Sequence, residues 1–83
     1  MEYTDFVQNP GKYELFQSAR IAKHIFSNNG DADLSVGQHV SIKFLAVCRN
    51  HLLRRDEPVY EVKVGAGEFW GYVYANALTN FVL

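Results

Sequence analysis

Apolar and charged residues alternate along residues 58–64 of the chain. Tyr60, Val62 and Val64 occupy alternate positions and would share one face of a strand. A period of two, with β-branched and aromatic residues on one side, indicates a strand with one buried face. The sequence Gly-Ala-Gly follows at residues 65–67, and glycine tolerates the positive φ that tight hairpin connections require. The pattern therefore predicts a β-hairpin whose return strand covers residues 68–75.

The two faces of this hairpin differ in how they can be covered. One face is predicted to be core, and its members are Tyr60, Val62, Val64, Phe69 and Val73. The other face carries an aromatic ladder on the return strand, made of Trp70, Tyr72 and Tyr74. Three large aromatic residues in a row are unusual on a surface that faces solvent. Another part of the chain, a second copy of it or a partner is therefore expected to cover the ladder.

The N-terminal segment, residues 1–30, has a helical pattern. Asn9 and Pro10 form a favourable start, since Asn is a preferred N-cap and Pro suits the first helical position. Apolar residues then recur at spacings of three and four, at Leu15, Ala19, Ala22 and Phe26. This predicts an amphipathic helix that ends near Asn-Asn-Gly at residues 28–30. The alternative is a strand over residues 19–26 with Ile21 and Ile25 pointing inward.

Residues 34–83 are predicted to form an antiparallel sheet. A strand is expected over about residues 36–47, because Val40, Ile42, Phe44 and Ala46 share one face. The other expected elements are a connection at 48–57 with a short helical turn at 51–54, a helical or 3₁₀ turn at 75–78 and a closing strand at 80–83. The predicted fold class is therefore α+β, an N-terminal helix packed on a small, strongly bent antiparallel sheet.

Composition places limits on the class of protein. The chain has 83 residues, enough for one domain (1–83) with a small core. Its net charge of -1 provides no basic bias that would steer it toward nucleic acid. Cys48 is the only cysteine, so no internal disulfide is possible. Because the sequence shows neither an export signal nor an apolar run of ~20 residues, we expect a soluble, cytoplasmic protein that does not bind membranes.

Three short motifs of the predicted sheet resemble bacterial-type SH3 domains. They are a Gly-led strand at residues 36–40, an aromatic-x-Val run at 59–62, and Gly71-Tyr72-Val73 with a turn that ends at Leu78. The resemblance covers about residues 34–80 and implies an SH3-like small barrel, with an all-β barrel as the alternative to α+β. Proline-rich peptides are not the implied ligand, because Tyr74 and Ala77 stand where family members that bind them have Pro and Tyr. The scaffold alone does not fix a function.

Two groups of residues are candidates for binding. The ladder could form a contact surface, since Trp and Tyr dominate interface hot spots, or it could be the seat of the N-terminal helix. A basic cluster follows the first strand and comprises Arg49, His51, Arg54 and Arg55. It could border the ladder and grip phosphate, or it could be a solvated loop whose charges are met by Asp56 and Glu57. The predicted binding residues are Trp70, Tyr72, Tyr74, Arg54, Arg55 and His51.

Metal and catalytic motifs are not expected. Asn29, Asp31 and Asp33 have the alternate spacing of a calcium loop, but Leu34 and Val40 stand where an EF-hand needs Gly and Glu. The three histidines show no ligand spacing to one another or to Cys48. The sequence therefore predicts no metal site, no cofactor and no catalytic residue.

The main functional hypothesis is a non-catalytic, stand-alone protein-binding module, an adaptor or inhibitor. Contact would run through the ladder with the arginines at its rim, and a homodimer could bury the same face. Short chains of this kind are common among proteins of phages and other mobile elements, which makes that origin an expectation. The alternatives are a small barrel that binds nucleic acid and, less favoured, an enzyme that uses Cys48 with a histidine.

Overall fold

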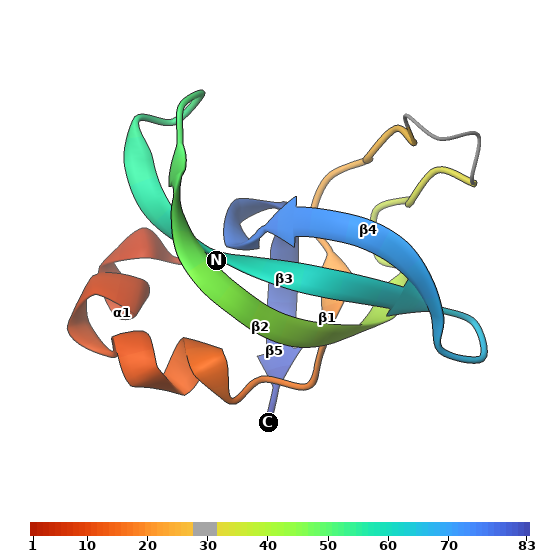
Figure 1. Cartoon of the computed structure of the whole chain (residues 1–83), viewed down its shortest axis with the longest axis horizontal. Helices are drawn as coiled ribbons and strands as arrows, with labels where there is room; N and C mark the ends of the chain where they lie inside the picture. The colour runs from red at the N-terminus through yellow and green to blue at the C-terminus, as the bar shows by residue number, and fades with distance from the viewer. Residues whose placement is uncertain (28–31) are drawn as a thin grey trace.

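One antiparallel sheet of five strands dominates the computed structural model, which describes residues 1–27 and 32–83 (Figure 1). The elements in chain order are α1 (Tyr3–Gln8), the 3₁₀ turn η1 (Pro10–Glu14), β1 (Ser18–Ile21), β2 (His39–Asn50), β3 (Arg55–Val64), β4 (Glu68–Tyr74), the 3₁₀ turn η2 (Ala75–Ala77) and β5 (Leu78–Val82). The strand order is β4-β3-β2-β1-β5, so β4 and β5 are the terminal strands of an unclosed sheet. A small antiparallel sheet with a short N-terminal helix is therefore confirmed.

The predicted amphipathic helix over residues 10–26 is wrong. Only η1 forms in its first part, after which Ala19 and Ile21, each 1% exposed, alternate along β1. β1 lies between β2 and β5 and pairs with both, and this tertiary pairing outweighs a local helical preference. Phe26, the last residue of the predicted apolar stripe, is 73% exposed. The alternative strand is confirmed as far as Ile21, whereas Ile25 forms only an isolated bridge.

The hairpin predicted over residues 58–75 is confirmed as β3 and β4. Gly65 and Gly67 have positive φ in the turn, as tight hairpin connections require. Most of the predicted core face is also correct, with Tyr60, Val62 and Val73 buried and Val64 packed against the core. The 3₁₀ turn and closing strand after it form as η2 and β5.

A β-bulge at Trp70 changes which side chains face the core. Val62 pairs with Gly71, while Lys63, one residue further along β3, pairs with Phe69. Trp70 is therefore an extra residue on β4, and the alternation shifts by one position there. Phe69, predicted to be core, moves to the outer face and is 54% exposed. Trp70, predicted to face outward, instead packs against the core.

The connection predicted at residues 48–57 is replaced by strand. β2 and β3 run through it as a long hairpin, with a turn at residues 51–54 and no helix there. Asn50 Oδ1 closes the turn by accepting hydrogen bonds from the backbone N–H groups of Leu52 (3.1 Å) and Leu53 (3.3 Å). Most residues in the second half of β2 are exposed. Because neither face of the strand is buried there, the sequence has no period-two pattern that would predict a strand.

The N-terminal segment covers the Tyr60 side of the sheet. Tyr60 is fully buried, and its hydroxyl donates a 2.5 Å hydrogen bond to the Tyr13 carbonyl in η1. The Tyr13 ring packs edge-on against Phe16 and Phe81. Figure 1 shows α1 and η1 on the side of the molecule away from β4. The N-terminal helix therefore does not cover the aromatic ladder. Within the described residues, no helix is long and apolar enough to cross a membrane.

Candidate functional site

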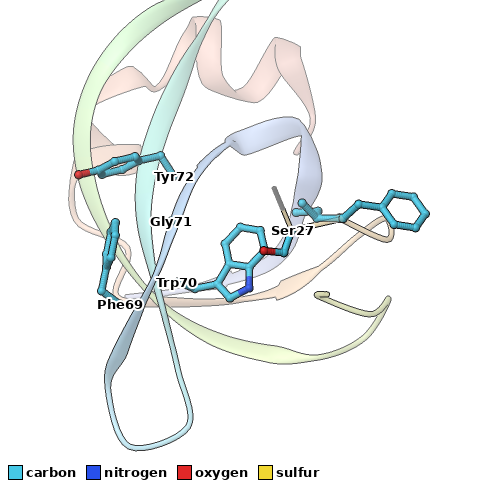
Figure 2. A pocket seen from close by; sticks show the side chains of 7 residues that line it. Ser27, Phe69, Trp70, Gly71 and Tyr72 are labelled. Atoms are coloured by element: carbon cyan, nitrogen blue, oxygen red, sulfur yellow. The ribbon is translucent and has the colours of Figure 1, made fainter. Parts of the chain in front are cut away.

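A cleft of about 320 Å³ runs beside β4 (Figure 2). It is lined by residues 69–72 on β4 and by residues 25–27 on the opposite wall. Successive residues of a strand point to opposite faces, so a cleft that touches four consecutive residues must follow the edge of the strand. The site is therefore the open seam between the last strand of the sheet and the segment after β1.

The bulge distributes the aromatic side chains around this seam. Figure 2 shows Phe69 and Tyr72 on one side of the β4 ribbon and Trp70 on the other. The Phe69 and Tyr72 rings are in contact, with centroids 5.3 Å apart and planes at 63°, and Tyr72 is 63% exposed. Phe69 and Tyr72 thus form an exposed aromatic pair, while Trp70 lines the inner side of the cleft.

Trp70 joins β4 to the far wall of the cleft. Its indole is half-buried against the core, and Nε1 donates a 2.7 Å hydrogen bond to the Ala32 carbonyl. The hydrogen bond fixes the orientation of the indole ring, whose apolar surface lines the cleft. The indole is therefore held in place before any partner arrives.

Contacts between residues 24–27 and residues 33–34 hold the opposite wall of the cleft in place. Ile25 exchanges two backbone hydrogen bonds of 2.9 Å with Leu34. Asp33 accepts a 2.9 Å hydrogen bond from the Ser27 backbone N–H and lies 3.2 Å from His24 Nε2. The Ser27 N–H, and next the His24 side chain, lower the pKa of the Asp33 carboxyl below its usual value. The carboxylate thus acts as a brace for the wall in its ionised form.

Acidification is expected to loosen this wall. Because the folded pKa of Asp33 is depressed, its bracing is complete at neutral pH and is lost as the pH falls through that pKa, below the usual carboxyl range. Trp70 bonds to the residue next to Asp33, so its fluorescence emission should move to longer wavelength in that window. Asp33→Ala should show the shifted emission already at neutral pH. Identical titrations of the two proteins would contradict the bracing role.

Gly71 leaves open space in the wall of the cleft that β4 forms. Its φ lies outside the left-handed region, and a Cβ built on it would meet no atom of the described chain within 4 Å. Neither backbone conformation nor internal packing therefore requires glycine at this position. A glycine inside a strand often marks a place where a ligand or another backbone comes close.

The structure brings together only part of the predicted site. Trp70 and Tyr72 both line the cleft, whereas Tyr74 is half-buried and its hydroxyl donates a 2.8 Å hydrogen bond to the Arg49 carbonyl. His51 and Arg54 are exposed on the turn of the β2–β3 hairpin. That turn and the β3–β4 turn lie at opposite ends of β3, which spans about 30 Å for its ten residues. These cations therefore do not border the cleft.

Arg55 makes its contacts within the fold. Its Nε donates a 2.7 Å hydrogen bond to the carboxylate of Glu57, which is fully buried, and its guanidinium lies 4.3 Å from the centre of the Tyr3 ring. The expectation that Glu57 meets an arginine charge is confirmed for Arg55. Sequence reasoning missed Phe26, Phe69 and Gly71 as members of the site. A glycine between two aromatic residues inside a strand, Gly71 between Trp70 and Tyr72, was the one sequence signal that could have revealed it.

The described part of the chain contains no cluster of side chains suited to a metal ion. No group of three or more His, Cys, Asp or Glu side chains there is close enough to hold a metal ion. Of the three residues with the spacing of a calcium loop, Asn29 and Asp31 lie outside the described residues, and Asp33 forms the brace described above. Cys48 is exposed on β2.

Comparison of the chain with protein-family models, with curated proteins and with solved structures finds no match.

Proposed function

We propose that this chain is a non-catalytic protein-binding module on an SH3-like scaffold, and that the cleft beside β4 is its contact surface. The scaffold is supported by the motifs that carry the resemblance. Residues 59–62 lie on β3 and Gly71-Tyr72-Val73 on the neighbouring β4, and η2 follows before Leu78. The sheet is antiparallel, and a register shift at residues 44–46 interrupts the pairing of β2 with β3.

The observation that carries the proposal is the set of apolar groups left open around Gly71. Phe26, Phe69 and Tyr72 are each more than half exposed, and Trp70 lies between them with its N–H already bonded. Preformed clefts lined by aromatic side chains are the usual shape of binding sites, and Trp and Tyr are enriched among residues that dominate binding energy. Large exposed apolar side chains gathered around one cleft are typical of an interaction site.

The proposal is tested by cross-linking capture from the native host with matched variants. Gly71→Val fills the cleft without disturbing a left-handed residue, and Arg54→Ala removes an exposed cation at the far end of the sheet. A partner that wild type and Arg54→Ala retain, and that Gly71→Val loses, supports the cleft as the contact surface. A partner that all three proteins retain equally contradicts it. Urea unfolding of the three proteins checks that Gly71→Val remains folded.

A further inference from the structure

We propose that the outer face of the sheet, the face turned away from the core, binds single-stranded nucleic acid. Arg20, Lys43 and Lys63 hold phosphates there, and bases stack on Phe69 and Tyr72. This second site goes beyond the proposed function, because it extends across strands β1 to β4 and away from the cleft. Three features carry it: the charge of the face, a depression bordered by two lysines and the exposed aromatic pair beside them.

The strand register gathers polar and aromatic side chains on this face. Three rows of paired residues cross it: Arg20–His39, Ser18–Ser41–Lys63–Phe69 and Lys43–Glu61–Tyr72. Along β2 and β3 these residues alternate with the buried Val40 and Val62, so they point away from the core. The N-terminal turn η1 packs on the core side, against Tyr60. From β1 to β4 the face is about 14 Å wide, at about 4.8 Å for each strand spacing.

The cations of this face are not held in ion pairs. Arg20, Lys43 and Lys63 are exposed, and they take part in none of the ion pairs found among the described residues. By contrast, Lys12 and Arg55 each lie 2.7 Å from a carboxylate oxygen. The net charge of -1 for the whole chain therefore conceals a local excess of positive charge, which attracts a polyanion.

A depression of about 380 Å³ lies in the middle of the face. It is lined by Gln17, Ser41, Ile42, Lys43, Glu61 and Lys63. Lys43 and Lys63 are diagonal neighbours on adjacent strands, which places their Cα atoms about 7–8 Å apart. Two ammonium groups with a hydroxyl between the strands are suited to phosphate oxygens. Glu61, which is half-buried, is the only carboxylate at the paired positions of the three rows.

The aromatic pair selects a polyanion that carries planar rings. Phe69 lies directly opposite Lys63, and Tyr72 lies directly opposite Glu61, so both rings stand next to the depression. Each of the two side chains is more than half exposed. In proteins that bind single strands, bases stack on such rings while cations hold the backbone. An acidic peptide or an anionic lipid surface matches the cations but brings no bases to stack on the rings.

The test is a fluorescence-anisotropy titration of labelled oligo(dU) and oligo(U) at several salt concentrations. Three phosphate contacts on a single strand predict a slope of about -2 for log affinity against log salt concentration. Lys43→Gln and Lys63→Gln should each make this slope shallower by about 0.7. Arg54→Gln, the same loss of charge at the far end of the sheet, should leave it unchanged. Tyr72→Ala should weaken binding about tenfold through loss of stacking.

Glu61→Gln gives a readout that damage to the fold does not imitate. It removes the carboxylate that repels phosphate and lies opposite Lys43. Affinity for both oligonucleotides should therefore rise severalfold, and the gain should shrink as salt screens the charge. Unchanged or lower affinity of Glu61→Gln would contradict a phosphate site at this depression.

Gly71→Val separates this site from the cleft. Gly71 pairs with the core residue Val62, so a side chain added there points to the other side of β4 from Tyr72, and oligonucleotide affinity should stay as in wild type. Loss of oligonucleotide binding in Gly71→Val would place the nucleic acid in the cleft and overturn the outer-face site.

Binding of either oligonucleotide with the expected salt slope supports the proposal, and the tighter of the two identifies the sugar. No binding at low salt overturns it, as does an equal response to Lys63→Gln and Arg54→Gln. Equal affinity for polyglutamate or for vesicles of anionic lipid also overturns it, because the rings then select nothing. None of these failures alters the capture experiment at the cleft, so the proposed function stands or falls separately.

Discussion

Glu57→Ala is expected to lower the free energy of unfolding by about 3 kcal/mol, because it removes a buried carboxylate and leaves its partners, the partly buried Arg55 guanidinium and the Asn76 backbone N–H, without their acceptor. The Glu57 carboxylate is fully buried and accepts hydrogen bonds from Arg55 Nε at 2.7 Å and from the Asn76 backbone N–H at 2.9 Å. It therefore joins the start of β3 to η2, the turn that leads into β5. Urea unfolding followed by circular dichroism measures the loss.

Two controls separate this effect from the general removal of a carboxylate. Glu57→Gln keeps an acceptor for the Asn76 N–H and should lose less stability than Glu57→Ala. Glu68→Ala removes an exposed carboxylate at the start of β4 and should leave stability nearly unchanged. Equal unfolding midpoints for Glu57→Ala and Glu68→Ala would contradict a structural role for the buried Glu57 carboxylate.

Tyr60→Ala is expected to lower the free energy of unfolding by about 3–5 kcal/mol, the usual range for removing a large buried aromatic ring. Tyr60 is fully buried and packs against the rings of Phe44 and Phe81. Tyr60→Phe keeps the ring but leaves the Tyr13 carbonyl without its hydroxyl donor, which should lower stability by about 1–2 kcal/mol.

Tyr72→Phe is the matched control for the hydroxyl. It makes the same chemical change on a side chain that is 63% exposed, so stability should stay nearly constant. The difference between the stability losses of Tyr60→Phe and Tyr72→Phe measures how much the hydrogen bond between Tyr60 and the Tyr13 carbonyl contributes to stability. If Tyr60→Phe and Tyr72→Phe unfold alike, that tie contributes nothing to stability.

The sheet was predictable where one face is buried and the partner strand is close in sequence. β3 and β4 follow from the alternation of Tyr60 and Val62 and from the glycine turn, both of which are local signals. β1 was misread, because Ala19 and Ile21 belong to a four-residue strand whose partners lie about twenty and sixty residues away. A helical spacing of apolar residues across residues 15–26 was accidental, and only tertiary pairing reveals this.

The site was predictable in location but not in geometry. An aromatic surface on β4 follows from the sequence, but a strict alternation assigns Trp70 and Phe69 to the wrong faces. The bulge that exchanges them is a difference in register of one residue between β3 and β4. The basic cluster was grouped by sequence proximity, and the long β2–β3 hairpin carries His51 and Arg54 to the far end of the sheet.

The most direct measurement is the affinity of the captured partner for proteins with Gly, Ala or Val at position 71, titrated through Trp70 fluorescence. A Cβ at this position meets no atom of the described chain, and glycine is unfavourable inside a strand. We therefore expect affinity for the partner to fall from Gly to Ala to Val at position 71, while the free energy of unfolding stays constant or rises. Equal affinity for all three proteins, or a loss of affinity that only follows a loss of stability, would contradict it.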